Sequence, residues 1–126
     1  MARLRRQQIL GTVDYTAYIC QAALRIPFGG AQALKEQVQR LAEAHIRGIQ
    51  VRVVPERLPH AVMLHSWLLL EFPHASPVVN VEVMNGGVYL HDDDARAYLS
   101  ALDALDRVAL SASASRHMLQ QTAEEL

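Results

Sequence analysis

The segment from Pro77 to Leu90 constrains the fold more than any other part of this sequence. Valines alternate with Asn80 and Glu82 between positions 78 and 83, which is the two-residue period of a half-buried β-strand. The sequence Asn-Gly-Gly at 85–87 is a strong tight-turn signal, and a second strand follows at 88–90. We therefore expect a β-hairpin, around which the chain must build a sheet.

Three further strands are expected before this hairpin. Ser66 to Phe72 is apolar at nearly every position, as is typical of a central strand covered on both faces. From Ile49 to Val53 apolar residues alternate with polar ones, and Pro55 closes that strand. β-forming residues between Tyr15 and Ile19 predict a first strand, and the glycines at 29 and 30 predict a loop after it. Together with the hairpin, these strands predict one small sheet, mixed or antiparallel.

Three segments are expected to form helices. From Ala31 to Arg47 the apolar residues and His45 recur at intervals of four, three and four, so they share one stripe, and Gly48 ends the helix. We expect His45 to be a hydrogen-bonded core or interface histidine. The run His91-Asp92-Asp93-Asp94 starts the next helix, because carboxylates favour a helix N-terminus. Ser111 caps a last helix. The buried stripe of the middle helix is expected at Tyr98, Leu102, Leu105 and Ala109.

The order of elements predicts an α+β domain with helices packed on one sheet face and a C-terminal helical hairpin. The chain has 126 residues, 51% of them hydrophobic, which is enough for one core, so we expect residues 1–126 to form a single domain. Arg5 to Leu10 resembles the last turn of a helix ending at Gly11, and domains seldom open in this way. The chain is therefore either a fragment of a longer protein or a stand-alone protein, and both interpretations stay open. We expect it to leave apolar surface uncovered, so that it forms a homodimer or binds a partner chain.

Composition argues against several classes of protein. The net charge of -1 provides no basic field of the kind that phosphate neutralisation requires, so we expect no DNA binding by this chain alone. No run of 18 apolar residues and no signal peptide is present, which indicates no membrane partner and a cytoplasmic protein. Cys20, the single cysteine, excludes an internal disulfide and is expected to be a buried, inert thiol.

No catalytic or metal-binding set is assembled in the sequence, and no cofactor is expected. Zinc sites require three or four converging ligands, commonly with a short spacing between two of them. The histidines near predicted strand ends lack a second close pair, so solvated loop residues are the favoured interpretation. They are His60, His65, His74 and His91.

Glu71 and Glu82 each lie within an otherwise apolar strand, where an unpaired carboxylate is costly or shifts its pKa upward. If the two strands are neighbours, both carboxylates can share one side with Arg52 and Tyr89. Two interpretations stay open: both acids face solvent, or they belong to a polar patch that recognises a ligand or a partner chain. The candidate patch comprises Arg52, His65, Trp67, Glu71, Asn80, Glu82 and Tyr89.

Six short segments occur in an order that resembles one family. They are Arg6-Gln7 with Ile9-Leu10, Ala23-Leu24-Arg25 with Gly29-Gly30, Val51 to Pro55, Leu69 to Pro73, Val78 to Glu82, and Gly86 to Leu90. They resemble the C-terminal domain of unknown function that follows a Cro/repressor-type helix-turn-helix in many actinobacterial regulators. These include developmental regulators of the WhiJ type and antitoxin-like Scr regulators. The resemblance implies a partner-binding, effector-sensing or dimerising module, with a small protein partner or a small-molecule effector.

The chain departs from the family pattern in three respects. Asn80 stands where the family usually has an aromatic residue, and His65 with Trp67 replaces a smaller, plainer start of the strand. The DNA-binding helices are missing, so DNA binding is not carried over. The alternative is a small enzyme or ligand-binding protein of a biosynthetic gene cluster that reuses the fold, with Glu71, Glu82 or His91 as the proton-transfer group.

Overall fold

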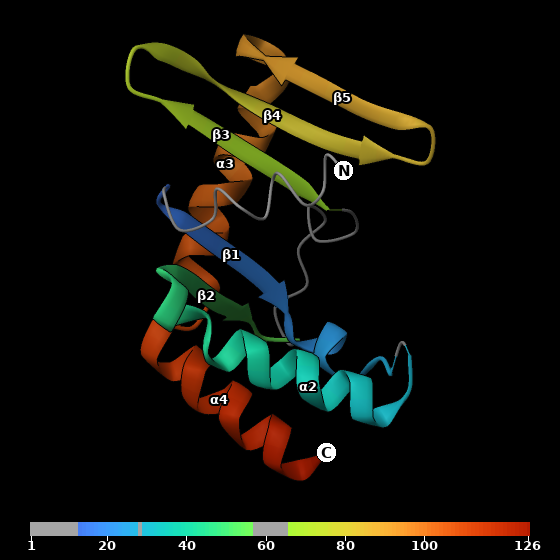
Figure 1. Cartoon of the computed structure of the whole chain (residues 1–126). Coiled ribbons are helices and arrows are strands. Elements are labelled where there is room, and N and C mark those ends of the chain that lie inside the picture. Colours follow the sequence, from blue (N-terminus) through green and yellow to red (C-terminus); the bar gives the residue numbers. More distant parts are fainter. Residues whose placement is uncertain (1–12, 28, 57–65) are drawn as a thin grey trace. The chain divides into compact units, whose positions relative to one another are not determined.

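The computed structural model describes residues 13–27, 29–56 and 66–126 (Figure 1). It contains helices and two β-sheets, which confirms the predicted α+β class. The predicted helix end at 5–10 lies outside the described residues, as does His65. In chain order the elements are β1 (Tyr15–Cys20), η1 (Gln21–Arg25), α2 (Ala31–Ala42), η2 (Ala44–Arg47), β2 (Ile49–Val54), β3 (Trp67–Phe72), β4 (Ala75–Val83), β5 (Gly86–His91), α3 (Asp92–Val108) and α4 (Ala112–Glu125).

The described chain divides into two compact units. The first unit contains residues 13–27, 29–56 and 108–126, and the second contains 66–107. The prediction of one sheet is wrong, because β1 and β2 form one sheet and β3, β4 and β5 form another. Strands β1 and β2 are parallel and need a long crossover, whereas β3 to β5 pair antiparallel through short turns. The single-domain organisation stays a prediction.

In the first unit, α2 and α4 pack on each other, and α4 also packs on β2. The apolar alternation of β2 turns Val51 and Val53 towards these helices. The predicted stripe of α2 supplies Leu34 and Val38, and α4 adds Leu119. The buried members of this core are Leu24, Leu34, Val38, Ala42, Ala44, Val51, Val53, Leu119 and Ala123.

The predicted helix from 31 to 47 is shorter than expected, and His45 is hydrogen-bonded as predicted but does not lie in the core. Helix α2 ends at Ala42, and the chain tightens into the 3₁₀ turn η2 before Gly48 ends it with a φ of 76°. This change of period takes His45 off the buried stripe, so that its side chain is exposed. The imidazole Nδ1 donates a hydrogen bond to the Ala42 carbonyl at 3.2 Å.

The strand β2 is held along its second edge by the chain that follows α3. The Val53 amide donates to Ser115 Oγ at 2.8 Å, and the Leu110 amide donates to the Val53 carbonyl at 2.9 Å. Ser115 is fully buried. Ser111 caps α4 as predicted, since its hydroxyl accepts the amide of Ala114 at 3.1 Å. The buried Ser115 hydroxyl therefore accepts a hydrogen bond from a β2 amide that does not pair with β1.

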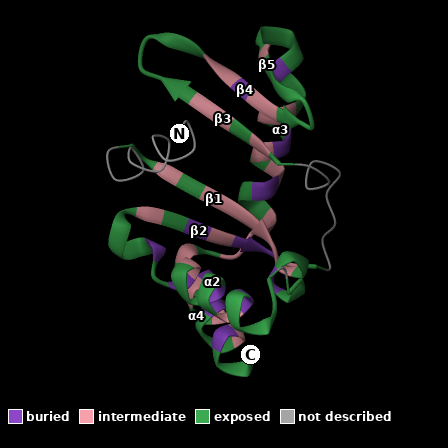
Figure 2. Cartoon of the chain, turned by 45° about the vertical axis from the view of Figure 1, so that its right-hand side comes forward, coloured by how far each residue is buried: buried purple, intermediate pink, exposed green. Residues whose placement is uncertain are grey.

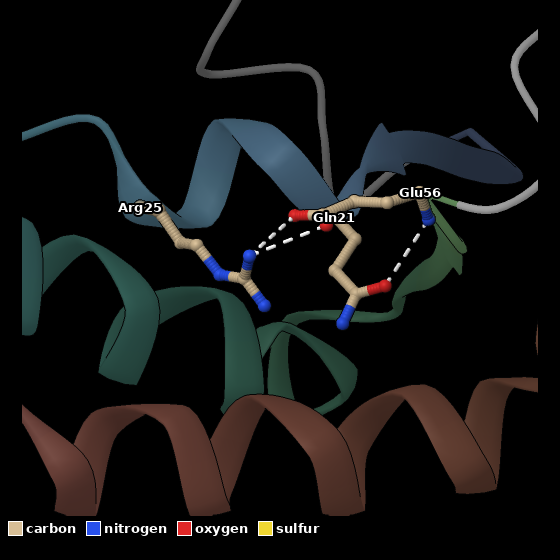
Figure 3. A network of polar contacts seen from close by, with 3 residues as sticks. All are labelled: Gln21, Arg25 and Glu56. Carbon is tan, nitrogen blue, oxygen red and sulfur yellow. Dashed lines mark hydrogen bonds and ion pairs between the residues drawn. The ribbon is translucent and has the colours of Figure 1, made fainter.

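Polar contacts also join the segments that follow β1 and β2 (Figure 3). The Arg25 guanidinium lies 3.0 Å from one carboxylate oxygen of Glu56 and donates to the other at 3.2 Å. The Glu56 amide donates to the side-chain oxygen of Gln21 at 3.2 Å. Because the Arg25 side chain is 67% exposed, this ion pair contributes little stability.

In the second unit, β4 lies between β3 and β5, and the predicted hairpin of β4 and β5 is confirmed. Val83 pairs with Gly86, so the turn consists of residues 84 and 85, and Gly86 has a φ of 143° that favours glycine. The prediction that β3 is central is wrong. It is an edge strand, and Leu68 and Phe72 are 37% and 48% exposed. An apolar run alone does not distinguish a central strand from an edge strand packed on one face.

Helix α3 begins at the predicted acidic run, with Asp92, Asp93 and Asp94 in its first turn. The predicted stripe is right for Leu105, which is buried, while Tyr98 and Leu102 are half-buried. Ala109 lies beyond the end of the helix, so its place on the stripe is wrong. None of the helices in the described part of the chain is long and apolar enough to cross a membrane.

Candidate binding face of the three-stranded sheet

The strand register sorts the side chains of β3, β4 and β5 onto two faces. Trp67 pairs with Val81, and its ring meets the ring of Tyr98 on α3 edge to face, with centroids 5.0 Å apart. Val79, on the same face, is completely buried. Side chains one position along each strand point to the opposite side, which we call the open face. The open face comprises Leu68, Leu70, Val78, Asn80, Glu82, Gly87, Tyr89 and His91.

The centre of the open face is a row of three directly paired residues. Asn80 of β4 pairs with Leu68 on one side and with Tyr89 on the other. Leu68 is 37% and Tyr89 61% exposed, whereas Asn80 is half-buried. A Cβ atom on Gly87 would lie 3.1 Å from Asn80 Nδ2, so the glycine makes room for the amide. The face thus combines exposed apolar surface with an amide and a phenol that both donate and accept hydrogen bonds.

The two acids predicted within apolar strands are both exposed. Strands β3 and β4 are indeed neighbours. Glu82 lies at one end of the open face, where it pairs with Gly87. Glu71 lies at an irregularity of the β3–β4 pairing, between Leu70 and Phe72. Of the two carboxylates, Glu82 is the one that the register brings together with Asn80 and Tyr89. Exposure also removes the expected cost of a carboxylate in an apolar interior.

Arg52 does not belong to this sheet. It lies on β2, where its Nε donates to the Leu110 carbonyl at 2.9 Å and its second guanidinium nitrogen donates to the Ala109 carbonyl at 3.0 Å. The guanidinium carbon also lies 5.5 Å from the ring centroid of Tyr18 on β1. Arg52 therefore fixes the chain after α3 to β2, because a planar guanidinium can reach two carbonyls and an aromatic face together.

Trp67, another predicted member of the patch, packs on the helix side of the sheet rather than on the open face. Its indole contributes to the packing of α3 through Tyr98. The exposed positions on the open face are instead taken by Leu68 and Tyr89. The two-residue period of the strand explains this outcome, since adjacent residues must point to opposite faces.

Glu82 and His91, two of the alternative catalytic residues, do not converge. Glu82 and Val78 are four residues apart on β4, and Val78 pairs with His91. Backbone positions of Glu82 and His91 are therefore about 14 Å apart, from a rise of about 3.4 Å per residue and a strand spacing of about 4.8 Å. That separation exceeds the reach of a hydrogen-bonded acid–base pair. Among the described residues no group of three or more His, Cys, Asp or Glu side chains could hold a metal ion.

Sequence reasoning missed a cavity of about 280 Å³ in the first unit. Its walls come from the end of α2 with η2, the start of β2, and α4. His45 and Arg116 are its ionisable lining residues. Three segments that are distant in sequence build this cavity, so no local pattern announces it. The sequence does show that Arg116 lies four residues after Ala112 and three before Leu119, so that a basic side chain shares one helix face with two apolar residues.

No curated protein and no solved structure matches this chain. One family model does match, described as a domain of unknown function (DUF5753), and it covers residues 1–121. Since this match spans nearly the whole chain, the protein belongs to the DUF5753 family.

Proposed function

We propose that this chain is a non-enzymatic, dimerising module of an actinobacterial transcriptional regulator or antitoxin-like protein, with the open face as its interface. The observation that carries the proposal is the row across β3, β4 and β5, in which the exposed side chains of Leu68 and Tyr89 flank the amide of Asn80. Apolar surface rimmed by polar groups is typical of protein–protein interfaces, and tyrosine is enriched at their centres.

The chemistry of the open face favours a second copy of the same chain. A two-fold interface requires a patch that is complementary to itself. The amide of Asn80 and the hydroxyl of Tyr89 each donate and accept hydrogen bonds, so each can pair with its own kind across a two-fold axis. Leu68, Leu70 and Val78 supply matching apolar area. The net charge of -1 adds little repulsion between copies.

The regulatory context is supported by the order of the six sequence segments described above. A dimerising module suits a repressor-type regulator, because two-fold symmetric operators are bound by dimers. The cheapest test of this context is genomic. A helix-turn-helix coding segment fused upstream supports the regulator, whereas a surrounding set of biosynthetic enzymes without such a segment contradicts it.

The interface is tested by sedimentation equilibrium over a wide range of protein concentration. We expect the parent chain to form a dimer and Leu68→Glu to be monomeric, since the substitution places two charges in an apolar contact. Ile46→Glu is the matched control, because Ile46 is 74% exposed on η2 and lies in the other unit. The control should dimerise as the parent does.

Two results would contradict this proposal. One is a parent chain that stays monomeric at every concentration. The other is a dimer that Leu68→Glu and Tyr89→Ala leave intact, which would place the interface elsewhere. If the parent is monomeric but the chain encoded beside it binds, and Leu68→Glu abolishes that binding, the open face serves a heterologous partner and the homodimer proposal fails.

A further inference from the structure

The cavity of the first unit has the chemistry of an anion site with an apolar floor. Leu41, Ile49 and Leu119 line it together with His45 and Arg116. None of the described residues that line it is acidic. Its volume of about 280 Å³ lies near the lower end of the range of roughly 300–1,000 Å³ found for small-molecule sites. The cavity and the open face share no residue, so the inference does not depend on the proposed dimer.

Arg116 is the strongest feature of this cavity. It is half-buried, and neither a hydrogen bond nor an ion pair joins its side chain to any other residue that the structure describes. A guanidinium carries five N–H donors in a planar fork and no acceptor. Placed against a concave wall without an acidic neighbour, this fork matches the two oxygens of a carboxylate.

His45, on η2, supplies a second polar group to the lining of the cavity. Because the Ala42 carbonyl can only accept a hydrogen bond, the Nδ1 atom of His45 carries the hydrogen in their 3.2 Å contact. This contact orients the ring and leaves Nε2 as the atom that can meet a ligand. Nε2 offers a lone pair when the ring is neutral and an N–H donor when it is protonated.

The N-terminal end of α4 reinforces the same preference. Ala112, the first residue of this 14-residue helix, lines the cavity, and the first turn contains no acidic residue. The Ser111 hydroxyl accepts from the Ala114 amide, but the first amides of a helix have no partner within the helix. The positive end of the helix dipole therefore adds to the charge of Arg116.

From these contacts we propose that the cavity binds a small organic carboxylate. The carboxylate pairs with the Arg116 guanidinium, and it accepts a hydrogen bond from His45 Nε2 when the imidazole carries both protons. Its hydrocarbon part lies against Leu41, Ile49 and Leu119. The apolar floor distinguishes this ligand class from inorganic anions, which gain nothing from burying hydrocarbon.

The probe is benzoate, titrated into the full chain and followed by the ¹⁵N–¹H NMR shifts of the cavity residues. A ligand of this size at ordinary efficiency binds with a Kd of about 1 mM. Benzamide keeps the shape without the charge, and inorganic phosphate keeps the charge without the ring. We expect both to bind about tenfold more weakly, because one loses the charge-assisted hydrogen bonds and the other loses the apolar contact.

Variants locate the site. Arg116→Gln should weaken benzoate binding about tenfold, and Ala112→Leu, which fills the cavity from the helix N-terminus, should also weaken it. Arg40→Gln is the matched control: Arg40 is an exposed residue of α2 outside the cavity lining, and the charge change is the same. It should bind benzoate as the parent does. Thermal melts of all three establish that they are folded.

The proposal is overturned by the absence of saturable benzoate binding, or by benzamide or phosphate binding as tightly as benzoate. It is also overturned if folded Arg116→Gln and Ala112→Leu bind benzoate like the parent. None of these results affects the oligomeric state, which is the measurement that tests the dimer proposal.

Discussion

Ser115→Ala tests how the second edge of β2 is held. Ser115 is fully buried, and its Oγ accepts the amide of Val53, which is also fully buried, at 2.8 Å. Removing the oxygen leaves that amide without an acceptor, which costs about 1–3 kcal/mol. The higher helix propensity of alanine returns about 0.5 kcal/mol. The expected net loss is about 0.5–2.5 kcal/mol, which lowers the Tm by roughly 2–12 °C in a chain of this length.

The assay is urea unfolding followed by far-UV circular dichroism, with Ser113→Ala as the matched control. Ser113 lies on the same helix and is exposed, so its replacement reports the propensity gain alone. The difference between the two variants isolates the buried hydrogen bond. If Ser115→Ala is as stable as Ser113→Ala, the hydroxyl does not hold the edge of β2 and the reasoning fails.

Four further outcomes are expected. Arg52→Ala should lower the free energy of unfolding by about 2 kcal/mol, because two backbone carbonyls lose a charged hydrogen-bond donor. Arg52→Lys should recover only part of this loss, and urea unfolding of both variants measures it. Gly87→Ala should weaken self-association, since a Cβ would lie 3.1 Å from Asn80 Nδ2 and displace the amide, as sedimentation would reveal. Glu82→Gln should make dimer formation less sensitive to salt, because it removes a charge at the rim of the open face. Glu71 is exposed and lies at the irregularity of the β3–β4 pairing, so Glu71→Gln should change the free energy of unfolding by no more than about 0.5 kcal/mol. In a gel-shift assay at physiological salt the chain alone should show no sequence-selective DNA binding, and selective retardation would refute the argument from its net charge of -1.

Local sequence patterns were sufficient to predict helices, strands and one strand pairing. The Asn-Gly-Gly turn signal and the alternating valines predicted the β4–β5 hairpin, and Gly48 predicted the end of the helical segment before β2. Ser111 and the run His91-Asp92-Asp93-Asp94 predicted two helix starts. These signals act through neighbouring residues, because turns, caps and periodicity depend on bonds within a few positions of the chain.

Grouping the candidate site residues required the sheet topology. The sequence placed Arg52 beside Glu82 and Tyr89, but the crossover through α2 commits β2 to β1 and leaves β3 to β5 as a separate sheet. Register then assigned Trp67 to the helix side and Leu68 to the open face, a distinction that one residue of slip would reverse.

The sequence by itself determined the α+β class, the strands, the hairpin and the helix starts, because each depends on the chemistry of adjacent residues. Tertiary structure alone decided that the strands form two sheets, that Asn80, Glu82 and Tyr89 share a face, and that His45 and Arg116 line one cavity. Those relations join residues up to 71 positions apart, from His45 to Arg116. They depend on which surfaces bury together, and a local pattern carries no information about that choice.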